Sequence, residues 1–137
     1  MKKIIVLGAT GFIGKNIAIN FSKNKSYEVH AVRYKRPAFN THNKIKWHKA
    51  DLRDPNKVNK LLKGMDIVIQ AAATTSGSKD IVSKPHVHVT DNAVMNSYIF
   101  RAAFDHDIKH VIFTSCTVMY PSSNKATSEK NFTGKII

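Results

Sequence analysis

The sequence predicts an α/β protein built on a doubly wound parallel sheet. Short apolar runs that can form buried strands alternate along the chain with amphipathic segments that can form helices. A turn with regularly spaced glycines follows the first apolar run directly. Such alternation with short links favours parallel strands joined by right-handed crossovers. The 137 residues suffice for one domain, residues 1–137, and are too few for an additional substrate domain.

The first half of the chain begins with a strand and a helix. Ile4–Leu7 is a continuous apolar run, typical of a central strand covered on both faces. From residue 11 to about residue 24, Ile13, Ile17 and Phe21 recur at four-residue spacing among polar residues, which predicts an amphipathic helix. The other elements expected in this half are a strand over 27–32, a weaker strand over 44–48 and a helix over 55–63.

The second half contains three further elements. Residues 66–70 carry a short apolar run and are expected to form a strand, which a polar loop follows. Between residue 91 and about residue 105, apolar pairs fall on one stripe and predict a helix. A last strand over 110–114 then leads into a loop over 115–120.

The turn after the first strand has the form of a dinucleotide-binding site. Its glycines have the spacing G-x-x-G-x-x-G between a buried strand and an amphipathic helix. Glycine permits a tight turn and a close approach of the backbone to a pyrophosphate, whose charge is stabilised at a helix N-terminus. A tight turn without a ligand is the alternative. The sequence thus predicts a Rossmann-type fold whose cofactor contacts Gly8, Thr10, Gly11, Phe12, Ile13 and Gly14.

The end of the second strand distinguishes between NAD and NADP. An acidic residue there binds the ribose hydroxyls of NAD, whereas a basic residue accommodates the additional phosphate of NADP. Arg33 occupies this position, and Lys35 and Arg36 follow closely. No acidic residue occurs between Arg33 and Asp51. NADP is therefore favoured over NAD, with Arg33 and Arg36 as its phosphate-binding residues. The alternative is that Arg33 is a solvated strand end in a lysine-rich protein.

The composition restricts the partners, the location and the kinds of site that the protein can have. Lys and Arg outnumber Asp and Glu 22 to 9, so the surface should attract anions. The lysines are scattered and no base-reading motif accompanies them, which argues against nucleic acid as a partner. The single cysteine, Cys116, fits a reducing cytosol. No segment approaches the roughly 20 apolar residues of a membrane span, and the seven histidines show no metal-ligand spacing.

On these motifs the sequence resembles the extended short-chain dehydrogenase/reductases, a family of NAD(P)-dependent nucleotide-sugar epimerases, dehydratases and reductases. The resemblance extends from Lys3 to about Glu129. It implies an adenine-contacting pair after the third strand, a stretch of small residues along the cofactor after the fourth strand, and an asparagine near the cofactor on the long helix. In this sequence these residues are Asp51 and Leu52, Ala71, Ala72 and Ala73, and Asn92.

The stretch FTSCTVMYP at 113–121 resembles the Ser/Thr loop of the same family, as found in GDP-L-fucose synthases and related reductases. In the family a Ser or Thr four residues before the tyrosine hydrogen-bonds the reacting sugar oxygen, and that position before Tyr120 is Cys116. A thiol is a weaker donor than a hydroxyl, so Ser115 or Thr117 could take the role instead. Alternatively, Cys116 is a small residue that packs at a strand end.

The acid–base pair of the family is missing from the sequence. In the family a tyrosine with a lysine four residues later moves the proton, and no tyrosine in this chain has a lysine at that spacing. Hydride transfer at an oxygen-bearing carbon also needs a positioned acid or base. The resemblance thus implies the N-terminal part of a longer enzyme, truncated before the catalytic Tyr helix and the substrate domain, and inactive alone. The alternative is a non-catalytic NADP-binding sensor module.

The resemblance also has implications for partners. The parent enzyme would act on a nucleotide sugar. Extended members of the family often dimerise through the helix that corresponds to residues 91–105 together with the tyrosine helix. A homodimer through the helix over 91–105 is therefore expected.

Overall fold

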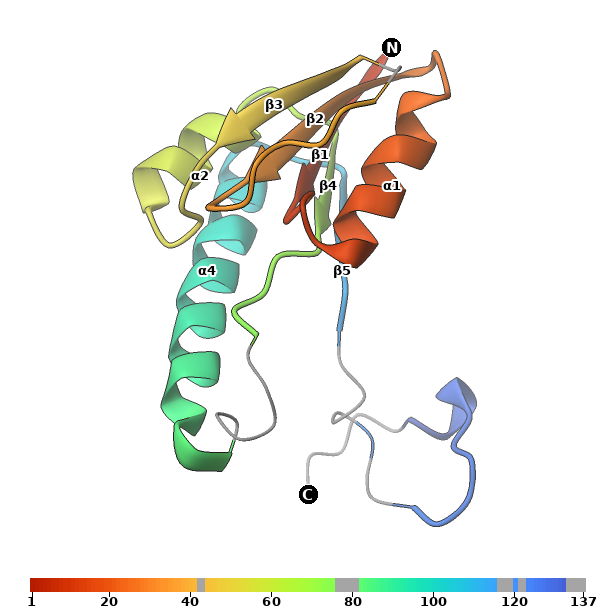
Figure 1. Cartoon of the computed structure of the whole chain (residues 1–137), viewed down its shortest axis with the longest axis vertical. Helices are drawn as coiled ribbons and strands as arrows, with labels where there is room; N and C mark the ends of the chain where they lie inside the picture. The colour runs from red at the N-terminus through yellow and green to blue at the C-terminus, as the bar shows by residue number, and fades with distance from the viewer. Residues whose placement is uncertain (42–43, 76–81, 116–119, 121–122, 133–137) are drawn as a thin grey trace.

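The protein folds into a five-stranded parallel sheet with helices on both faces (Figure 1). The computed structural model describes residues 1–41, 44–75, 82–115, 120 and 123–132. The strands are β1 (Lys2–Leu7), β2 (Tyr27–Arg33), β3 (Ile45–Lys49), β4 (Ile67–Gln70) and β5 (His110–Phe113). The helices are α1 (Phe12–Ser22), α2 (Pro55–Leu62), α4 (Pro85–Asp105) and a 3-10 turn over Glu129–Asn131.

The order of the strands is β3-β2-β1-β4-β5, and every pair is parallel. The chain moves outward from β1 to β3 and then crosses over to β4 on the other side of β1. This reversal is the topological switch point of a doubly wound sheet, and ligands of such folds bind beside it at the carboxyl ends of the strands. The α/β, Rossmann-type fold class predicted from the sequence is confirmed.

β1 is the centre of the structure. Its last four residues, Ile4–Leu7, are fully buried, as the continuous apolar run predicted. Because successive side chains of a strand point to opposite faces, Ile4 and Val6 pack with Ala18 of α1, while Ile5 and Leu7 pack on the face that α2 and α4 cover. The two hydrophobic cores therefore meet at this one strand, and the turn that follows it is held in place from both sides.

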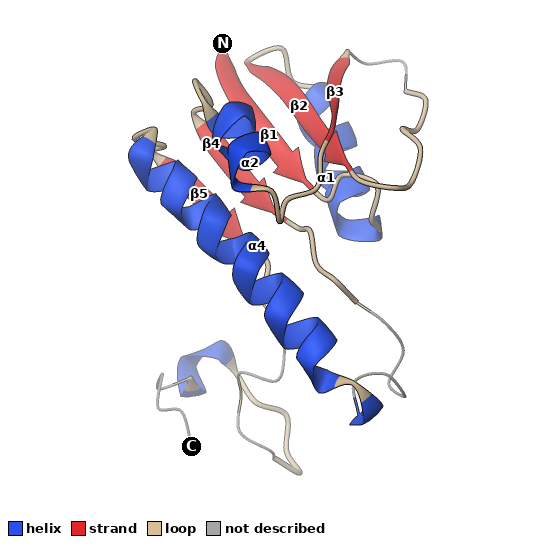
Figure 2. Cartoon of the chain, turned by 90° about the vertical axis from the view of Figure 1, so that its left-hand side faces the viewer, coloured by secondary structure: helices blue, strands red, loops and turns tan. Residues whose placement is uncertain are grey.

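α4 begins six residues earlier than the predicted helix, at Pro85 rather than at residue 91. Proline suits the first turn of a helix because no N–H is lost there. Val87 and Val89 in this first part are 39% and 67% exposed, so no apolar stripe marked it in the sequence. Figure 2 shows that this part of α4 extends beyond the carboxyl edge of the sheet. None of the helices in the described ranges is long and apolar enough to cross a membrane.

β5 forms the open edge of the sheet opposite β3. All four of its residues are exposed, including Val111, Ile112 and Phe113. The ring of Phe113 makes an edge-to-face contact with Phe100 of α4, with 5.7 Å between the ring centroids. β5 leads from this edge towards the segment predicted to contact substrate.

Candidate cofactor site

A pocket of about 560 Å³ lies at the carboxyl ends of the strands, beside the switch point between β1 and β4. It collects residues from four separate turns of the chain, which become neighbours because parallel strands all end at the same edge. The predicted residues that line it are Gly8, Thr10, Gly11, Arg33, Arg36, Asp51, Leu52, Ala71, Ala72 and Ala73.

The other predicted cofactor residues lie outside the pocket lining. Phe12 and Ile13, on the first turn of α1, are 86% and 53% exposed. Gly14 is buried beneath the turn. Asn92 lies on α4 and hydrogen-bonds the loop after β4: its Oδ1 accepts from the Thr74 N–H at 2.9 Å, and its Nδ2 donates to the Thr74 and His88 carbonyl oxygens. These residues shape the site rather than line it.

The glycine turn is closed too tightly for side chains. Gly8 has a φ of +76°, and a Cβ there would lie 2.6 Å from Cα of Ala72. A Cβ on Gly14 would overlap the carbonyl oxygen of Gly8 and lie 2.9 Å from its carbonyl carbon. The Gly11 N–H closes the turn by donating to the Gly8 carbonyl oxygen at 3.0 Å. The N-terminus of α1 consequently faces the pocket, where its free N–H groups favour an anion.

The wall beside this turn is fixed by one buried amide. Gln70, the last residue of β4, is fully buried. Its Nε2 donates to the Ala72 carbonyl oxygen at 3.0 Å and to Asn96 Oδ1 of α4 at 2.8 Å, and its Oε1 accepts from the Ala72 N–H at 3.2 Å. Because a buried amide without partners would be costly, these bonds fix the course of residues 71–73 along the pocket.

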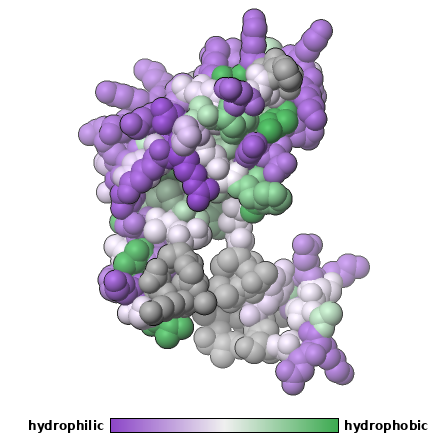
Figure 3. Space-filling model, viewed as in Figure 1, coloured by the Kyte–Doolittle hydropathy of each residue, from purple (hydrophilic) through white to green (hydrophobic). Residues whose placement is uncertain are grey.

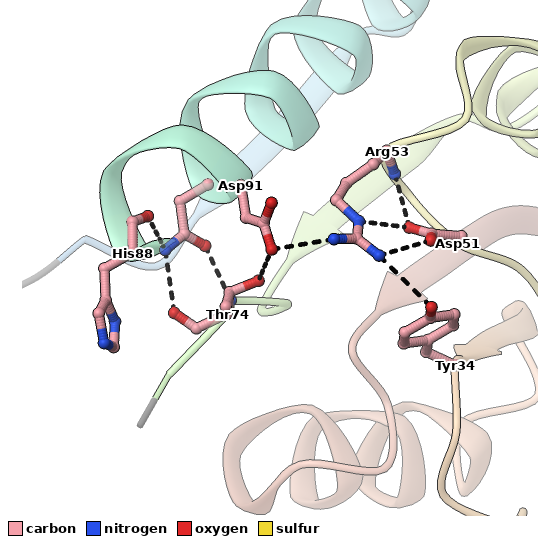
Figure 4. Close-up of polar contacts among 7 residues, drawn as sticks. Tyr34, Asp51, Arg53, Thr74, His88 and Asp91 are labelled. Carbon is pink, nitrogen blue, oxygen red and sulfur yellow. Dashed lines mark hydrogen bonds and ion pairs between the residues drawn. The ribbon is translucent and has the colours of Figure 1, made fainter. Parts of the chain in front are cut away.

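Arg53 connects two sides of the pocket (Figure 4). Its Nη2 and Nε donate to the two carboxylate oxygens of Asp51 at 2.8 and 3.0 Å. Its Nη1 donates to Oδ2 of Asp91 on α4 at 3.0 Å, and Nη2 also reaches the Tyr34 hydroxyl at 3.4 Å. Asp91 additionally accepts from the Thr74 hydroxyl at 3.4 Å. The guanidinium group thus connects the loops after β2 and β3 with α4, and the loop after β4 joins the network through Asp91.

This network shifts the pKa values of Asp51 and Arg53. The side-chain hydrogen bonds from Arg53 hold the pKa of Asp51 well below its usual range, against the opposing effect of burial. The hydrogen bonds to Asp51 and Asp91 in turn raise the pKa of Arg53 further above its usual value. Asp51 is therefore ionised at neutral pH, and the same arginine pairs with both acids that line the pocket.

Three other cations line the pocket without such a partner. Within the described residues, no acidic side chain pairs with Arg33, Lys35 or Arg36. Arg33 is half-buried at the end of β2, and Lys35 and Arg36 are exposed in the loop that follows. The Lys35 ammonium lies 5.4 Å from the centre of the Tyr34 ring, an aromatic contact that leaves its charge uncompensated. This side of the pocket is consequently positive.

The predicted substrate-contacting residues follow β5. Ser115 lies two residues beyond the end of β5 and is exposed, whereas Cys116 and Thr117 lie outside the described residues. The preceding residue, Thr114, is anchored because both its N–H and its hydroxyl donate to the Gln70 carbonyl oxygen, at 3.1 and 3.0 Å. Ser115 therefore follows a fixed residue at the carboxyl edge. Across the described part of the chain, no three His, Cys, Asp or Glu side chains are grouped to hold a metal ion.

Several pocket residues were not identified from the sequence, namely Tyr34, Arg53, Thr74, Asp91 and Met95. One of them carried a local signal. The spacing Asp51-x-Arg53 allows a two-point ion pair within a turn, in which the Arg53 N–H also donates to Asp51 Oδ1 at 3.0 Å. Asp91 carried no such signal, because its partner Arg53 is 38 residues away in the chain.

The comparisons with known proteins agree with this geometry. A family model described as "NAD dependent epimerase/dehydratase family" matches residues 4–136. GDP-mannose 3,5-epimerase 1 of Oryza sativa subsp. japonica is 28% identical over 121 residues, which are 87% of this chain and 32% of that protein. GDP-mannose 3,5-epimerase of Arabidopsis thaliana is 30% identical over the same length and covers the same shares. The chain spans about a third of the length of these relatives.

Solved structures show the same fold. UDP-N-acetylglucosamine 4-epimerase from Methanobrevibacter ruminantium M1, in complex with UDP-N-acetylmuramic acid, has a TM-score of 0.79 and 26% identity over 94% of this chain and 43% of that one. UDP-glucose 4-epimerase from Bifidobacterium longum, in complex with NAD+ and UDP, has a TM-score of 0.78 and 23% identity over 93% and 42%. In both comparisons nearly the whole chain corresponds to less than half of the solved protein.

Proposed function

Because the chain belongs to the NAD dependent epimerase/dehydratase family, we propose that it binds NADP(H) as the cofactor-binding portion of an enzyme that acts on nucleotide sugars. The similar proteins include GDP-mannose epimerases and a UDP-N-acetylglucosamine epimerase, which supports a sugar linked to a nucleoside diphosphate as the class of substrate. Epimerisation, dehydration and reduction are all compatible with this cofactor.

The charge balance of the pocket is the observation that carries the preference for NADP(H). A carboxylate available to accept from ribose hydroxyls favours NAD, and Asp51 and Asp91 are both engaged by Arg53. Arg33 and Arg36 line the same pocket without an acidic partner among the described residues. A guanidinium group can form two parallel hydrogen bonds to a phosphate. The site is therefore suited to a 2′-phosphate.

The remaining residues fit the rest of the dinucleotide. Gly8 and Gly11 leave room for a pyrophosphate at the N-terminus of α1, and the contact of Gly8 with Ala72 shows how close the backbone lies there. Asp51 and Leu52 line the side of the pocket assigned to adenine, and the small residues Ala71–Ala73 line the side assigned to the remainder of the cofactor. When bound, the nicotinamide ring would supply or accept a hydride.

The chain's own part in the chemistry is binding and orientation. Ser115 follows β5 at the carboxyl edge of the sheet and is the described residue that we propose as a hydrogen-bond donor to the substrate oxygen, with Cys116 and Thr117 as the neighbouring candidates. No tyrosine of the sequence has a lysine four residues later. We therefore propose that this chain alone binds cofactor without turnover. The same observation favours, as a second candidate, a non-catalytic NADP-binding sensor.

Two further properties belong to this proposal. Phe100 and Phe104 of α4 are 43% and 83% exposed, and this apolar surface supports a homodimer through α4. The single cysteine supports a reducing location, the cytoplasm.

Calorimetric titration with NADPH and with NADH tests the proposal. We expect NADPH to bind about ten- to a hundredfold more tightly, as one or two charge-assisted hydrogen bonds would provide. Replacing Arg33 and Arg36 together by Gln should reduce NADPH affinity to that of NADH and leave NADH binding unchanged. The matched control is the double Lys84→Gln, Lys125→Gln variant, which removes the same charge elsewhere.

Three outcomes would count against the proposal. Equal or tighter binding of NADH would refute the preference for NADP(H), and binding of neither cofactor would refute the cofactor site itself. An equal loss in the control variant would mean that net charge, rather than the two arginines, attracts the cofactor.

A further inference from the structure

The edge of the sheet opposite the cofactor pocket carries a second concentration of positive charge. Exposed lysines lie at the amino ends of the strands: Lys2 in the first position of β1, Lys25 two residues before β2, Lys44 directly before β3 and Lys63 shortly before β4. In the sequence they are about 20 residues apart and form no cluster. In a parallel sheet, however, all strands begin at the same edge, so these lysines come together.

The order of the strands arranges them in a row. Read across the sheet β3-β2-β1-β4, the lysines follow as Lys44, Lys25, Lys2 and Lys63. We call these four residues the amino-edge row. With about 4.8 Å between neighbouring strands, the row extends over about 15 Å. Figure 3 shows hydrophilic side chains gathered over the upper end of the molecule, where the chain begins and the strands start.

Most of the charge of the row is uncompensated. Within the described residues, none of its four lysines forms a salt bridge. Of the carboxylates at this edge, Asp107 pairs with Lys109 and Asp105 pairs with Arg101, while Asp66 accepts from the Lys3 N–H and offsets at most one of the four lysine charges. The row therefore presents a net positive surface to solvent.

Neither the fold nor the proposed cofactor explains the row. A lysine at a helix C-terminus stabilises the helix dipole, which accounts for Lys63 after α2. Lys2, Lys25 and Lys44 lie at the beginnings of strands, where no such dipole exists. NADP(H) would bind at the carboxyl ends of the strands, on the opposite edge. The pocket thus contains only some of the basic residues, which outnumber the acidic residues 22 to 9.

The edge is also shaped to receive a ligand. One shallow hollow is lined by Met1, Lys2, Lys25, Ser26 and Tyr27, and an adjoining one by Asn20, Phe21, Lys23, Asn24, Lys25 and Tyr27. Lys25 and Tyr27 line both hollows. Lys2, Lys23 and Lys25 of these linings carry ammonium groups, which suit phosphate oxygens.

From this arrangement we infer that the amino edge binds the phosphate backbone of a nucleic acid duplex, without reading its sequence. About 15 Å of duplex axis carries roughly nine phosphate charges, enough to meet all four lysines. Single strands are usually held by stacking on exposed aromatic rings, but Phe21 and Tyr27 are partly buried and contact each other edge to face at 5.0 Å. An anionic lipid surface would also attract these lysines, and Met1 and Phe104 are exposed large apolar residues near this edge, so the vesicle measurement below distinguishes the two partners.

The inference revises the expectation drawn from the sequence and does not depend on the proposed cofactor. The scattered lysines argued against nucleic acid, because a cluster was sought along the chain rather than across the sheet. A base-reading motif is still lacking, and only binding that is independent of sequence is inferred.

Fluorescence anisotropy with a labelled 20-base-pair DNA duplex of mixed sequence, at several salt concentrations, tests the inference. Four phosphate contacts predict that log K falls with log salt at a slope of about −3.6. Replacing Lys2, Lys25 and Lys44 by Gln should reduce the magnitude of the slope by about 2.7, or 0.9 for each lysine. The control replaces Lys84, Lys125 and Lys130 by Gln, which changes the net charge equally at the opposite end of the molecule, and should leave the slope nearly unchanged.

Two further measurements make the test decisive. NADPH at saturating concentration should not displace the duplex, because the two sites lie on opposite edges; displacement would place the duplex in the cofactor pocket and overturn the inference. Equal weakening in the two triple variants, or no binding at low salt, would overturn it as well. Vesicles of phosphatidylserine and phosphatidylcholine are the second probe. If the protein bound them through Lys2, Lys25 and Lys44 and did not bind the duplex, the inference would also be overturned.

Discussion

The guanidinium group of Arg53 lies against the carboxylate of Asp51 in a two-point ion pair, with Nη2 2.8 Å from Oδ2 and Nε 3.0 Å from Oδ1. The third nitrogen of the same group reaches Asp91 at 3.0 Å. Asp51 comes from the loop after β3, and Asp91 comes from α4. One side chain thus fixes two carboxylates of the pocket lining and offsets part of their negative charge, which would otherwise repel an incoming anion.

Replacing Arg53 by Gln should therefore weaken NADPH binding by about tenfold, because two carboxylates would then repel the phosphates of the cofactor. The change in the free energy of unfolding should stay below about 1 kcal/mol, since Arg53 is partly exposed and such pairs contribute little to stability. Calorimetry and urea denaturation measure the two effects. The control is Arg101→Gln, which breaks the exposed Arg101–Asp105 pair on α4. An equal loss of affinity in both variants would contradict this role.

Gly14→Ala should destabilise the fold at the glycine turn. The added Cβ would overlap the Gly8 carbonyl group, which cannot move because the turn is packed from both faces. We expect a loss of about 2–3 kcal/mol in the free energy of unfolding, as for overpacked cores. Gly64→Ala is the control: it has open space but a φ of +75°, so it should cost only about 1 kcal/mol. A control variant less stable than Gly14→Ala would show that packing at the turn is looser than described.

A chain of three side chains crosses β2 and β3. The carboxylate of Glu28 accepts a hydrogen bond from His30 Nε2 at 2.8 Å, so that His30 Nδ1 can face His48 Nε2 at 2.9 Å. Hydrogen bonds from Lys46 and then His30 lower the pKa of Glu28 to about 2, which keeps it ionised. Burial lowers the pKa of His48, and the nearby His30 and Lys46 lower it further. Only one proton fits between the two rings.

This arrangement predicts that the protein loses stability in mildly acidic solution. In the unfolded chain His48 binds a proton at about pH 6.5. In the folded protein its pKa is lower, so the unfolded state takes up more protons as the pH falls. Stability should therefore be complete above about pH 6.5 and decrease as the pH falls from there towards the lowered pKa. Urea denaturation between about pH 7.5 and 5.5 measures this dependence.

Two variants show whether His48 is the source. His48→Gln should flatten the pH dependence, because the amide can still donate to His30 without taking up a proton. His86→Gln, at an exposed position on the first turn of α4, should retain the dependence of the unchanged protein. If His48→Gln retained it too, the titration would arise elsewhere.

The elements with local signals were predicted well from the sequence. β1, the glycine turn and α1 were identified because a continuous apolar run, glycine spacing and a four-residue period all lie within about twenty residues of chain. The structure brings Gly8, Arg33, Asp51 and Ala72 into one pocket, as the common edge of a parallel sheet requires. The start of α4 was missed because its first turns are exposed and carry no apolar stripe.

The contacts that could not be predicted from the sequence join residues that are far apart in the chain and close together in the fold. Arg53 and Asp91 are 38 residues apart, and nothing in either segment indicates the other. The amino-edge row likewise appears only after the strand order is known, because Lys44 and Lys63 lie on opposite sides of Lys2 in the sheet although both follow it in the chain. Lysines that are scattered along the chain give no local signal, whereas the sheet brings together residues that are separated by a whole strand and helix.

Because Gly8 and Ala72 are in tight contact, the backbone of the proposed cofactor site tolerates fewer substitutions than its charged side chains do. The glycine turn and the small-residue wall are in backbone contact, so neither position accepts a larger residue unless the other segment moves with it. Lys35 and Arg36, by contrast, are exposed in the loop after β2. The preference of the proposed site for NADP(H) can thus be changed by replacing exposed side chains. The glycine turn and the small-residue wall, by contrast, can be replaced only together.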